Sequence, residues 1–228
     1  MEGRVTSAVL FDLDGTLIDS APDIHALANR ILDAEGAAPL SIDEARSFVG
    51  RGAPAFVAQM CAARELPKAN ETRLLAEFIE GYNDAVSLTQ PYHGVREALD
   101  VLQASGHLLA ICTNKPEMPA RSVLAHLGLD HAFPVVLGGD SVARKKPDPQ
   151  MLDEARRTLG AQRAIFVGDS EVDAETAWRA GLPFLLHIKG YRTGSVDALP
   201  HFKRFADFAC LPALIDGAFS VEPAAGRN

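Results

Sequence analysis

Carboxylates stand in pairs in this sequence at spacings that could serve phosphate or metal chemistry. The first stretch is Asp12-Leu13-Asp14-Gly15-Thr16, in which one residue separates two carboxylates. Such groups can act as nucleophiles, as general acids or bases, or as ligands of a hard cation. Asp and Gly are also common in turns after strands, so this stretch alone leaves a simple polar turn open.

Three later stretches supply a hydroxyl with an amide, a lysine, and a second pair of carboxylates. In chain order they are Thr113-Asn114, Lys146-Pro147 and, within Gly168–Asp173, the carboxylates Asp169 and Asp173. Each alone is also typical of a helix cap, a helix entry or an acidic helix N-terminus. Their recurrence after separate apolar segments favours one shared site over unrelated turns.

The elements that must position these groups are short apolar strands. Candidate strands cover residues 8–11, 108–112, 135–137, 164–167 and 184–188. Helical periodicity lies between them, over 95–104, 120–127, 149–159 and 172–180. This alternation predicts right-handed crossovers and an α/β fold with a parallel sheet, in which ligands bind at the carboxyl ends of the strands.

The segment from about residue 20 to 90 breaks this alternation. It contains no convincing strand, and its helix formers predict helices over 23–34, 42–49, 53–64 and 71–86. The Ser20-to-Asp23 spacing predicts a capping box at the first of these helices. We therefore expect a core from 1–18 and 92–228, interrupted by an all-helical cap over 19–91.

The combined motifs resemble those of the haloacid dehalogenase superfamily. The matching strings are DLDGT at 12–16, TN at 113–114, KP at 146–147 and GDSEVD at 168–173. The similarity extends over almost the whole chain, including a helical insertion after the first motif. It implies a Rossmann-like parallel sheet core with an inserted all-helical cap.

The resemblance also implies a role for each carboxylate. Asp12 would attack phosphorus and form an aspartyl phosphate, while Asp14 would serve first as an acid and then as a base. Mg²⁺ is the implied ion, held by Asp12, the Asp14 carbonyl and Asp169, with Asp173 in support. The dehalogenases of this superfamily lack the second carboxylate in its acid/base role, so Asp14 favours phosphoryl chemistry.

The remaining motif residues would handle the phosphoryl group. Gly15 and Thr16 would lie beside the phosphate, and Gly15 would let the backbone approach it closely. Thr113, Asn114 and Lys146 would hold the phosphoryl oxygens, with Lys146 offsetting charge in the transition state. The sequence contains neither GxxxxGK[ST] nor GxGxxG, so a P-loop or a dinucleotide site has no support.

The expected cap carries one further candidate, Arg51, between Gly50 and Gly52. The sequence resembles those of phosphoglycolate phosphatases in this glycine-flanked turn and in three strings, FDLDGTLIDS, KKPDP and VGDSEVDA. The implied substrate is 2-phosphoglycolate, whose carboxylate Arg51 could bind. Phosphatases of sugar phosphates, nucleotides or pyrophosphate, a hexose-phosphate mutase and a non-catalytic phosphate-binding regulator stay open as alternatives.

The composition of the chain limits its possible binding partners and its location. The chain has 228 residues and a formal net charge of −8, with no basic run, which argues against nucleic acid as the main partner. Three separated cysteines without CxxC spacing suggest reduced thiols rather than a disulfide framework. The first apolar run is too short for a signal peptide or a membrane span. We therefore expect a cytoplasmic protein acting on a small phosphorylated substrate, in an oligomeric state that the sequence leaves open.

Overall fold

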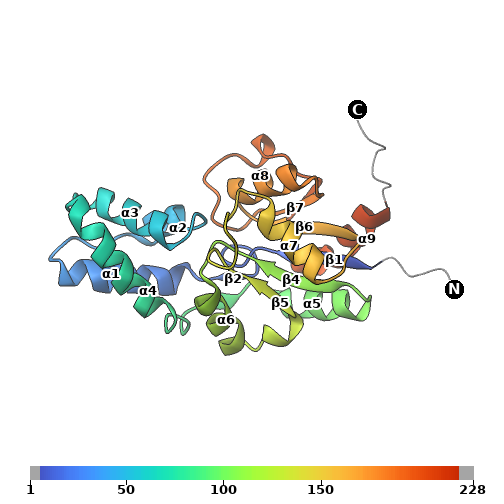
Figure 1. Cartoon of the computed structure of the whole chain (residues 1–228), viewed down its shortest axis with the longest axis horizontal. Coiled ribbons are helices and arrows are strands. Elements are labelled where there is room, and N and C mark those ends of the chain that lie inside the picture. Colours follow the sequence, from blue (N-terminus) through green and yellow to red (C-terminus); the bar gives the residue numbers. More distant parts are fainter. Residues whose placement is uncertain (1–5, 221–228) are drawn as a thin grey trace.

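The computed structural model describes residues 6–220 and shows a sheet-containing body at one end and a group of helices at the other (Figure 1). Every pair of neighbouring strands in the sheet is parallel. In spatial order the strands are β5 (Val135–Leu137), β4 (Leu108–Cys112), β1 (Ser7–Phe11), β6 (Arg163–Gly168), β7 (Phe184–His187) and β8 (Lys203–Phe205). The predicted α/β fold is confirmed.

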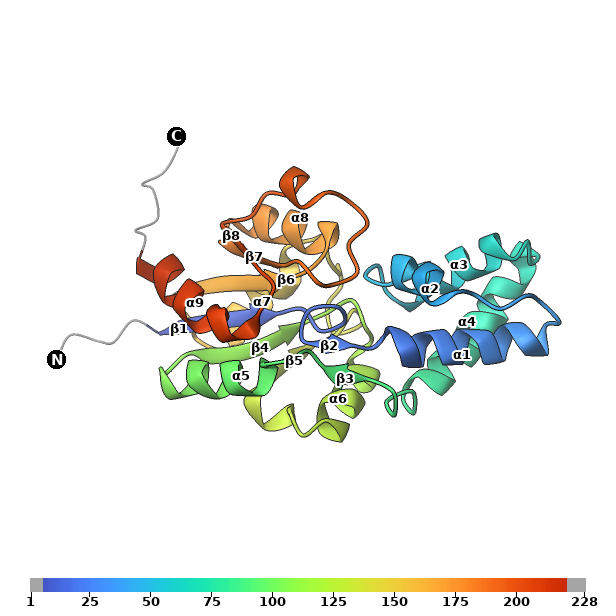
Figure 2. The ribbon, with the colours of Figure 1, turned by 180° about the vertical axis from the view of Figure 1, so that it is seen from behind.

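Helices cover both faces of this sheet, because its central strands are apolar on both sides. In β1, Val9 and Phe11 pack in the apolar cluster on one face, whereas Ala8 and Leu10 pack in the cluster on the other. We call these the first and the second face. The second face is toward the viewer in Figure 1, and the first face is toward the viewer in Figure 2. Helices α5 (Val95–Ala104), α6 (Glu117–His126) and α9 (Leu211–Ser220) cover the first face, and α7 (Gln150–Thr158) and α8 (Glu171–Ala180) cover the second.

Two elements of this body have no counterpart among the predicted ones. Strand β8 is an edge strand in which Lys203 and Arg204 are exposed, so it lacks the apolar run that marks the other strands. Helix α9 carries Pro212 near its start and Gly217 within it, and both residues obscure helical periodicity. Its buried Leu211 and Ile215 nevertheless join the core beneath the sheet.

Residues 21–82 form four helices with an apolar core of their own. These are α1 (Ala21–Ala34), α2 (Ile42–Phe48), α3 (Ala53–Ala63) and α4 (Glu71–Tyr82). The core includes the ring pairs Phe56–Phe78 and Phe78–Tyr82, whose centroids lie 5.1 and 5.0 Å apart. Helix α4 ends at Tyr82, earlier than the predicted 86, and residues 83–89 form turns and irregular backbone instead.

Two short antiparallel strands join the helical unit to the body: β2 (Ile18–Asp19) and β3 (Gln90–Pro91). The predicted capping box at α1 is wrong. The Ser20 hydroxyl makes no cap hydrogen bond and instead donates to Asp14 Oδ1 at 2.5 Å. Asp23 Oδ2 accepts hydrogen bonds from Leu88 N, Thr89 N and Thr89 Oγ1, which ties the start of α1 to the returning chain.

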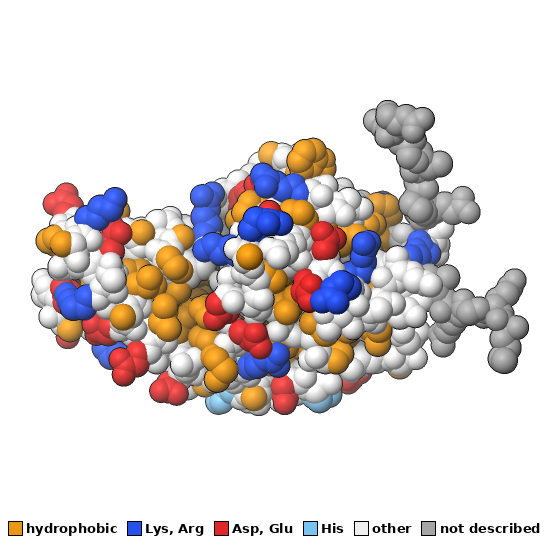
Figure 3. Space-filling view, viewed as in Figure 1, with side chains coloured by type: hydrophobic (Ala, Val, Ile, Leu, Met, Phe, Trp, Pro, Cys, Tyr) orange, Lys and Arg blue, Asp and Glu red, His pale blue; other side chains and the backbone are white. Residues whose placement is uncertain are grey.

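The face drawn in Figure 3 has no large patch of only positive or only negative side chains, because Lys and Arg are scattered among Asp and Glu. Across residues 6–220 no helix has both the length and the apolar character needed to span a membrane.

Candidate active site

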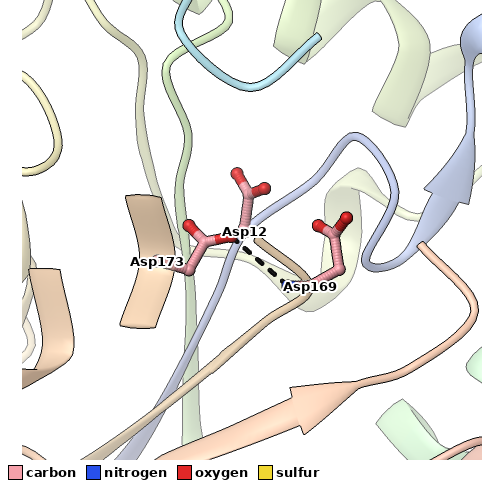
Figure 4. Close-up of side chains that lie close together, drawn as sticks. All are labelled: Asp12, Asp169 and Asp173. Atoms are coloured by element: carbon pink, nitrogen blue, oxygen red, sulfur yellow. Dashed lines mark hydrogen bonds between the residues drawn. The ribbon is translucent and has the colours of Figure 1, made fainter. Parts of the chain in front are cut away.

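Three buried carboxylates meet where β1 and β6 end. Asp12 follows β1, Asp169 follows β6, and Asp173 lies in the first turn of α8 (Figure 4). One carboxylate oxygen from each lies within 4.8 Å of the others, and the three residues are at most 5% exposed. Parallel strands bring their carboxyl ends to one edge, which explains how residues more than 150 positions apart meet here.

Lys146 provides a cation inside this acidic cluster. Its Nζ lies 2.8 Å from Asp12 Oδ1 and donates a hydrogen bond to Asp173 Oδ1 at 2.6 Å. Burial lowers the pKa of Lys146, but the two carboxylates outweigh burial and raise it. Lys146 therefore stays positively charged beside Asp12 and Asp173.

The acidic cluster still carries more negative charge than Lys146 can offset. Burial, followed by the Asp173 charge, raises the pKa of Asp12 to about 7. Burial also raises the pKa of Asp169 well above its ordinary value. The three carboxylates offer oxygen ligands for a divalent hard cation such as Mg²⁺, because the cation would offset the negative charge that they hold in a buried place.

Hydrogen bonds fix Asp169 in this position. Thr16 Oγ1 donates to Asp169 Oδ1 at 2.8 Å, and Tyr191 N donates to Asp169 Oδ2 at 2.6 Å. Gly15 has a φ of +84°, and a Cβ there would lie 2.6 Å from Asp169 Oδ2. The DGT turn therefore requires glycine both for its backbone conformation and for space.

Asp14 faces a different set of partners from Asp12. Its Oδ1 accepts the hydrogen bond from Ser20 and lies 3.3 Å from Lys115 Nζ. Asp14 is 7% exposed, and it borders two separate cavities. Asp14 therefore shares its cavities with Asp12 but is held by Ser20 and Lys115 instead of Lys146.

Thr113 and Asn114 follow β4, as predicted, and both are buried. Thr113 Oγ1 accepts a hydrogen bond from Lys115 N at 3.2 Å. Asn114 Nδ2 donates to the carbonyls of Gly50 and Lys146, each at 3.0 Å, whereas Asn114 Oδ1 has no partner among residues 6–220. Asn114 therefore links the core rim to the loop at 50–52.

Arg51 lies in that loop and is exposed. Lys145 Nζ donates to the Arg51 carbonyl at 2.9 Å, so the backbone of the loop contacts the core at this point. Gly52 has a φ of +86°, and a Cβ there would lie 3.0 Å from the Asn114 carbonyl oxygen. Close approach of loop and core thus depends on glycine at 52.

Two cavities meet at Asp12 and Asp14. The larger, of about 480 Å³, is also lined by Arg51, Asp169 and Tyr191. The smaller, of about 20 Å³, lies toward the helical unit and is also lined by Phe56, Tyr82, Thr113, Asn114 and Lys115. Asp12 and Asp14 therefore border open space in two directions.

Sequence reasoning missed three residues that contact the predicted ones. Lys115 directly follows Asn114 and precedes a proline, and its adjacency to the second motif was the available signal. Tyr191 follows β7 in a loop, and its hydroxyl donates to Asp19 Oδ1 at 2.6 Å. Ser20 was misassigned as a cap. These contacts link residues of different elements, so local patterns do not reveal them.

Comparison with known proteins places these features in a family context. A model of the haloacid dehalogenase-like hydrolases matches residues 9–187. A phosphoglycolate phosphatase of Rhodobacter capsulatus is 47% identical over 212 residues, covering 92% of this chain and 97% of that protein. One from Cereibacter sphaeroides is 43% identical over 210 residues, covering 91% of this chain and 96% of that protein. The crystal structure of a predicted phosphoglycolate phosphatase from Haemophilus somnus superimposes with a TM-score of 0.86 at 29% identity, covering 92% of this chain and 98% of that one.

Proposed function

We propose that this chain is a Mg²⁺-dependent phosphatase that forms an aspartyl phosphate on Asp12. The chain belongs to the haloacid dehalogenase-like hydrolase family and is a phosphoric monoester hydrolase. The observation that carries the proposal is the buried cluster of Asp12, Asp169 and Asp173 around Lys146. It combines a nucleophile, oxygen ligands for a hard cation and a fixed positive charge at one point.

The reaction would proceed in two displacements on phosphorus. In the first, an Asp12 oxygen bonds to phosphorus while the ester bond breaks, and Asp14 gives its proton to the leaving oxygen. In the second, Asp14 takes a proton from water, the water oxygen bonds to phosphorus, and phosphate leaves Asp12 unmodified. The different contacts of the two carboxylates, Asp12 with Lys146 and Asp14 with Ser20 and Lys115, support this division of roles.

The phosphoryl oxygens would be held by groups at the same rim. We assign this role to Lys146, Thr113 and Asn114, with Gly15 and Thr16 bordering the phosphate. Lys146 already contacts Asp12, so it lies next to any phosphorus that Asp12 attacks. Asn114 would serve both the phosphate and the Gly50 carbonyl that it contacts here.

We assign Mg²⁺ to Asp12, the Asp14 carbonyl and Asp169, with Asp173 in support. Mg²⁺ bound there would neutralise part of the charge that accumulates when a phosphate dianion meets these carboxylates. Asp173 is suited to a supporting role at the Mg²⁺ site, because its oxygens accept hydrogen bonds from Lys146 and from Ser170 Oγ.

For the substrate we propose 2-phosphoglycolate, on the strength of the relatives at 43–47% identity and their near-complete coverage. Residues 19–91 would act as the cap, with 1–18 and 92–228 as the core, and Arg51 would contribute a positive charge at the mouth of the larger cavity. That cavity, at about 480 Å³, could also admit a sugar phosphate or a nucleotide, so these phosphatase activities are the main alternative.

We further propose a cytoplasmic location. All three cysteines, Cys61, Cys112 and Cys210, are free thiols, as is usual in a reducing compartment.

A substrate panel tests the proposal. The purified enzyme would be assayed for phosphate release from 2-phosphoglycolate, glucose 6-phosphate, a nucleoside monophosphate, pyrophosphate and p-nitrophenyl phosphate, with Mg²⁺ and with excess chelator. We expect the highest kcat/KM for 2-phosphoglycolate and loss of all activity in chelator. Another leading ester would overturn the substrate, transfer to a second sugar hydroxyl would indicate a mutase, and activity in chelator would overturn the metal. No release from any ester would indicate a phosphate-binding regulator.

A further inference from the structure

Lys115 is a buried cation that bridges the core and the helical unit. Its Nζ lies 3.3 Å from Asp14 Oδ1 and 3.9 Å from the centre of the Tyr82 ring. The Lys115 side chain is 2% exposed. Because Tyr82 ends α4, this one ammonium group contacts both the proposed acid/base of the core and the proposed cap.

The smaller cavity lies beside this ammonium group. It has a volume of about 20 Å³, which suits one or two water molecules or a group of a few atoms. Phe48, Phe56 and Phe78 give it apolar walls, while Asp12, Asp14 and Lys115 form its polar end. A sugar ring does not fit such a space, and Lys115 is the only cation among its lining residues in the described part of the chain.

We propose that Lys115 binds the carboxylate of the substrate's leaving group, and so selects short phosphate esters that carry an acid group. This inference rests on the phosphatase function proposed above and names the residue that recognises the leaving group. Lys115 is assigned to substrate binding rather than to the bond-breaking steps.

The covalent structure of the substrate brings its carboxylate within reach. Asp14 must lie beside the ester oxygen in order to protonate it, and in 2-phosphoglycolate the carboxylate carbon is only two bonds from that oxygen. Lys115 Nζ lies 3.3 Å from Asp14 Oδ1. An ammonium group has three donors, so one can stay on Asp14 while another meets the carboxylate.

Arg51 is less well placed for this contact. Arg51 is an exposed residue, and it borders the larger cavity rather than the smaller one. A contact in water is weakened by screening, whereas a buried cation facing a carboxylate is screened far less. Arg51 therefore provides a matched comparison for Lys115: a nearby cation on the exposed side of the same site.

A binding measurement separates this proposal from catalysis. Calorimetry with Mg²⁺ would compare 3-phosphonopropionate, in which a methylene replaces the ester oxygen of phosphoglycolate, with propylphosphonate, which lacks the carboxylate. We expect the wild type to bind 3-phosphonopropionate roughly 10- to 100-fold more tightly, as a hydrogen bond to a charged group predicts. Lys115→Met should lose this preference, Lys115→Arg should keep most of it, and Arg51→Ala should retain it within a few-fold.

The possible outcomes distinguish this inference from the proposed function. Equal affinities of the wild type for both phosphonates would overturn the inference, as would a preference that survives in Lys115→Met. If Lys115→Met shows no thermal unfolding transition, Lys115→Gln takes its place. Hydrolysis of p-nitrophenyl phosphate, assayed separately, reports on the phosphatase function. An active enzyme without carboxylate preference would leave that function standing and remove only the role of Lys115.

Discussion

Two regions border the same cavities but hold their side chains in different ways. The core rim is the carboxyl edge of the sheet, with Asp12, Asn114 and Asp169. The cap face is the part of the helical unit opposite it, with Phe56 and the loop at 50–52. At the rim, Asp169 and Asp173 each have several fixed hydrogen-bond partners. On the cap face, apolar rings and an exposed arginine line the space, and the loop at 50–52 reaches the core through its backbone carbonyls. We therefore expect changes at the rim to affect the reaction itself, and changes on the cap face, where Arg51 is exposed, to have smaller effects on substrate binding.

The largest effect should come from Asp12. In Asp12→Asn the amide keeps the shape but cannot form the acyl phosphate, so we expect kcat on 2-phosphoglycolate to fall by at least about 10⁴-fold. Removing one of three repelling carboxylates should leave the fold intact. Steady-state kinetics and thermal unfolding check both points, and a variant with appreciable turnover would exclude Asp12 as the nucleophile.

Asp14→Asn should have the next largest effect, and it should depend on the leaving group. Loss of general acid catalysis predicts a decrease of about 10²- to 10⁴-fold in kcat/KM for 2-phosphoglycolate. The decrease should be smaller for p-nitrophenyl phosphate, whose leaving oxygen needs less protonation. Comparison of the two esters provides the check, and equal decreases would contradict the acid role.

The contact between loop and core can be tested with two neighbouring glycines. Gly50 and Gly52 both have positive φ, but only at Gly52 would a Cβ approach the core, at 3.0 Å from the Asn114 carbonyl; at Gly50 it would meet nothing within 4 Å. Both alanine variants should be strained by about 1–2 kcal/mol, and Gly52→Ala should in addition displace the loop.

We expect KM for 2-phosphoglycolate to rise about fivefold more in Gly52→Ala than in Gly50→Ala, which corresponds to about 1 kcal/mol. Parallel Michaelis–Menten measurements would show this. The same KM in both variants would mean that the contact of Gly52 with the core has no influence on substrate binding.

Arg51→Ala should have the smallest effect. Because Arg51 is exposed, its interaction with a substrate carboxylate should contribute about 0.2–1 kcal/mol, or at most about fivefold in kcat/KM. Raising the salt concentration should reduce the difference between wild type and variant. A salt-independent loss of a hundredfold would instead place Arg51 in direct contact with the substrate.

Local sequence patterns predicted the rim better than the cap face. Asp12, Asn114 and Asp169 each follow a buried strand, and parallel strands bring such positions to one edge whatever the loops do. The position of Lys115, directly after Asn114, could be predicted in the same way, but its contact with Tyr82 could not, because Tyr82 comes from a helix of the insertion. The contacts of Asp23 could not be predicted either, because its partners at 88–89 lie at least 65 residues further along the chain.

The covalent intermediate offers the most direct test of the central claim. Enzyme turning over 2-phosphoglycolate with Mg²⁺ would be quenched with borohydride, which reduces an acyl phosphate to an alcohol and so converts the modified aspartate to homoserine. Peptide mass spectrometry would then locate the change, with Asp14→Asn included to slow the second displacement and Asp12→Asn as the blank. The account predicts homoserine at position 12 and none in the blank. Steady turnover with unmodified Asp12, or homoserine at another aspartate, would contradict it.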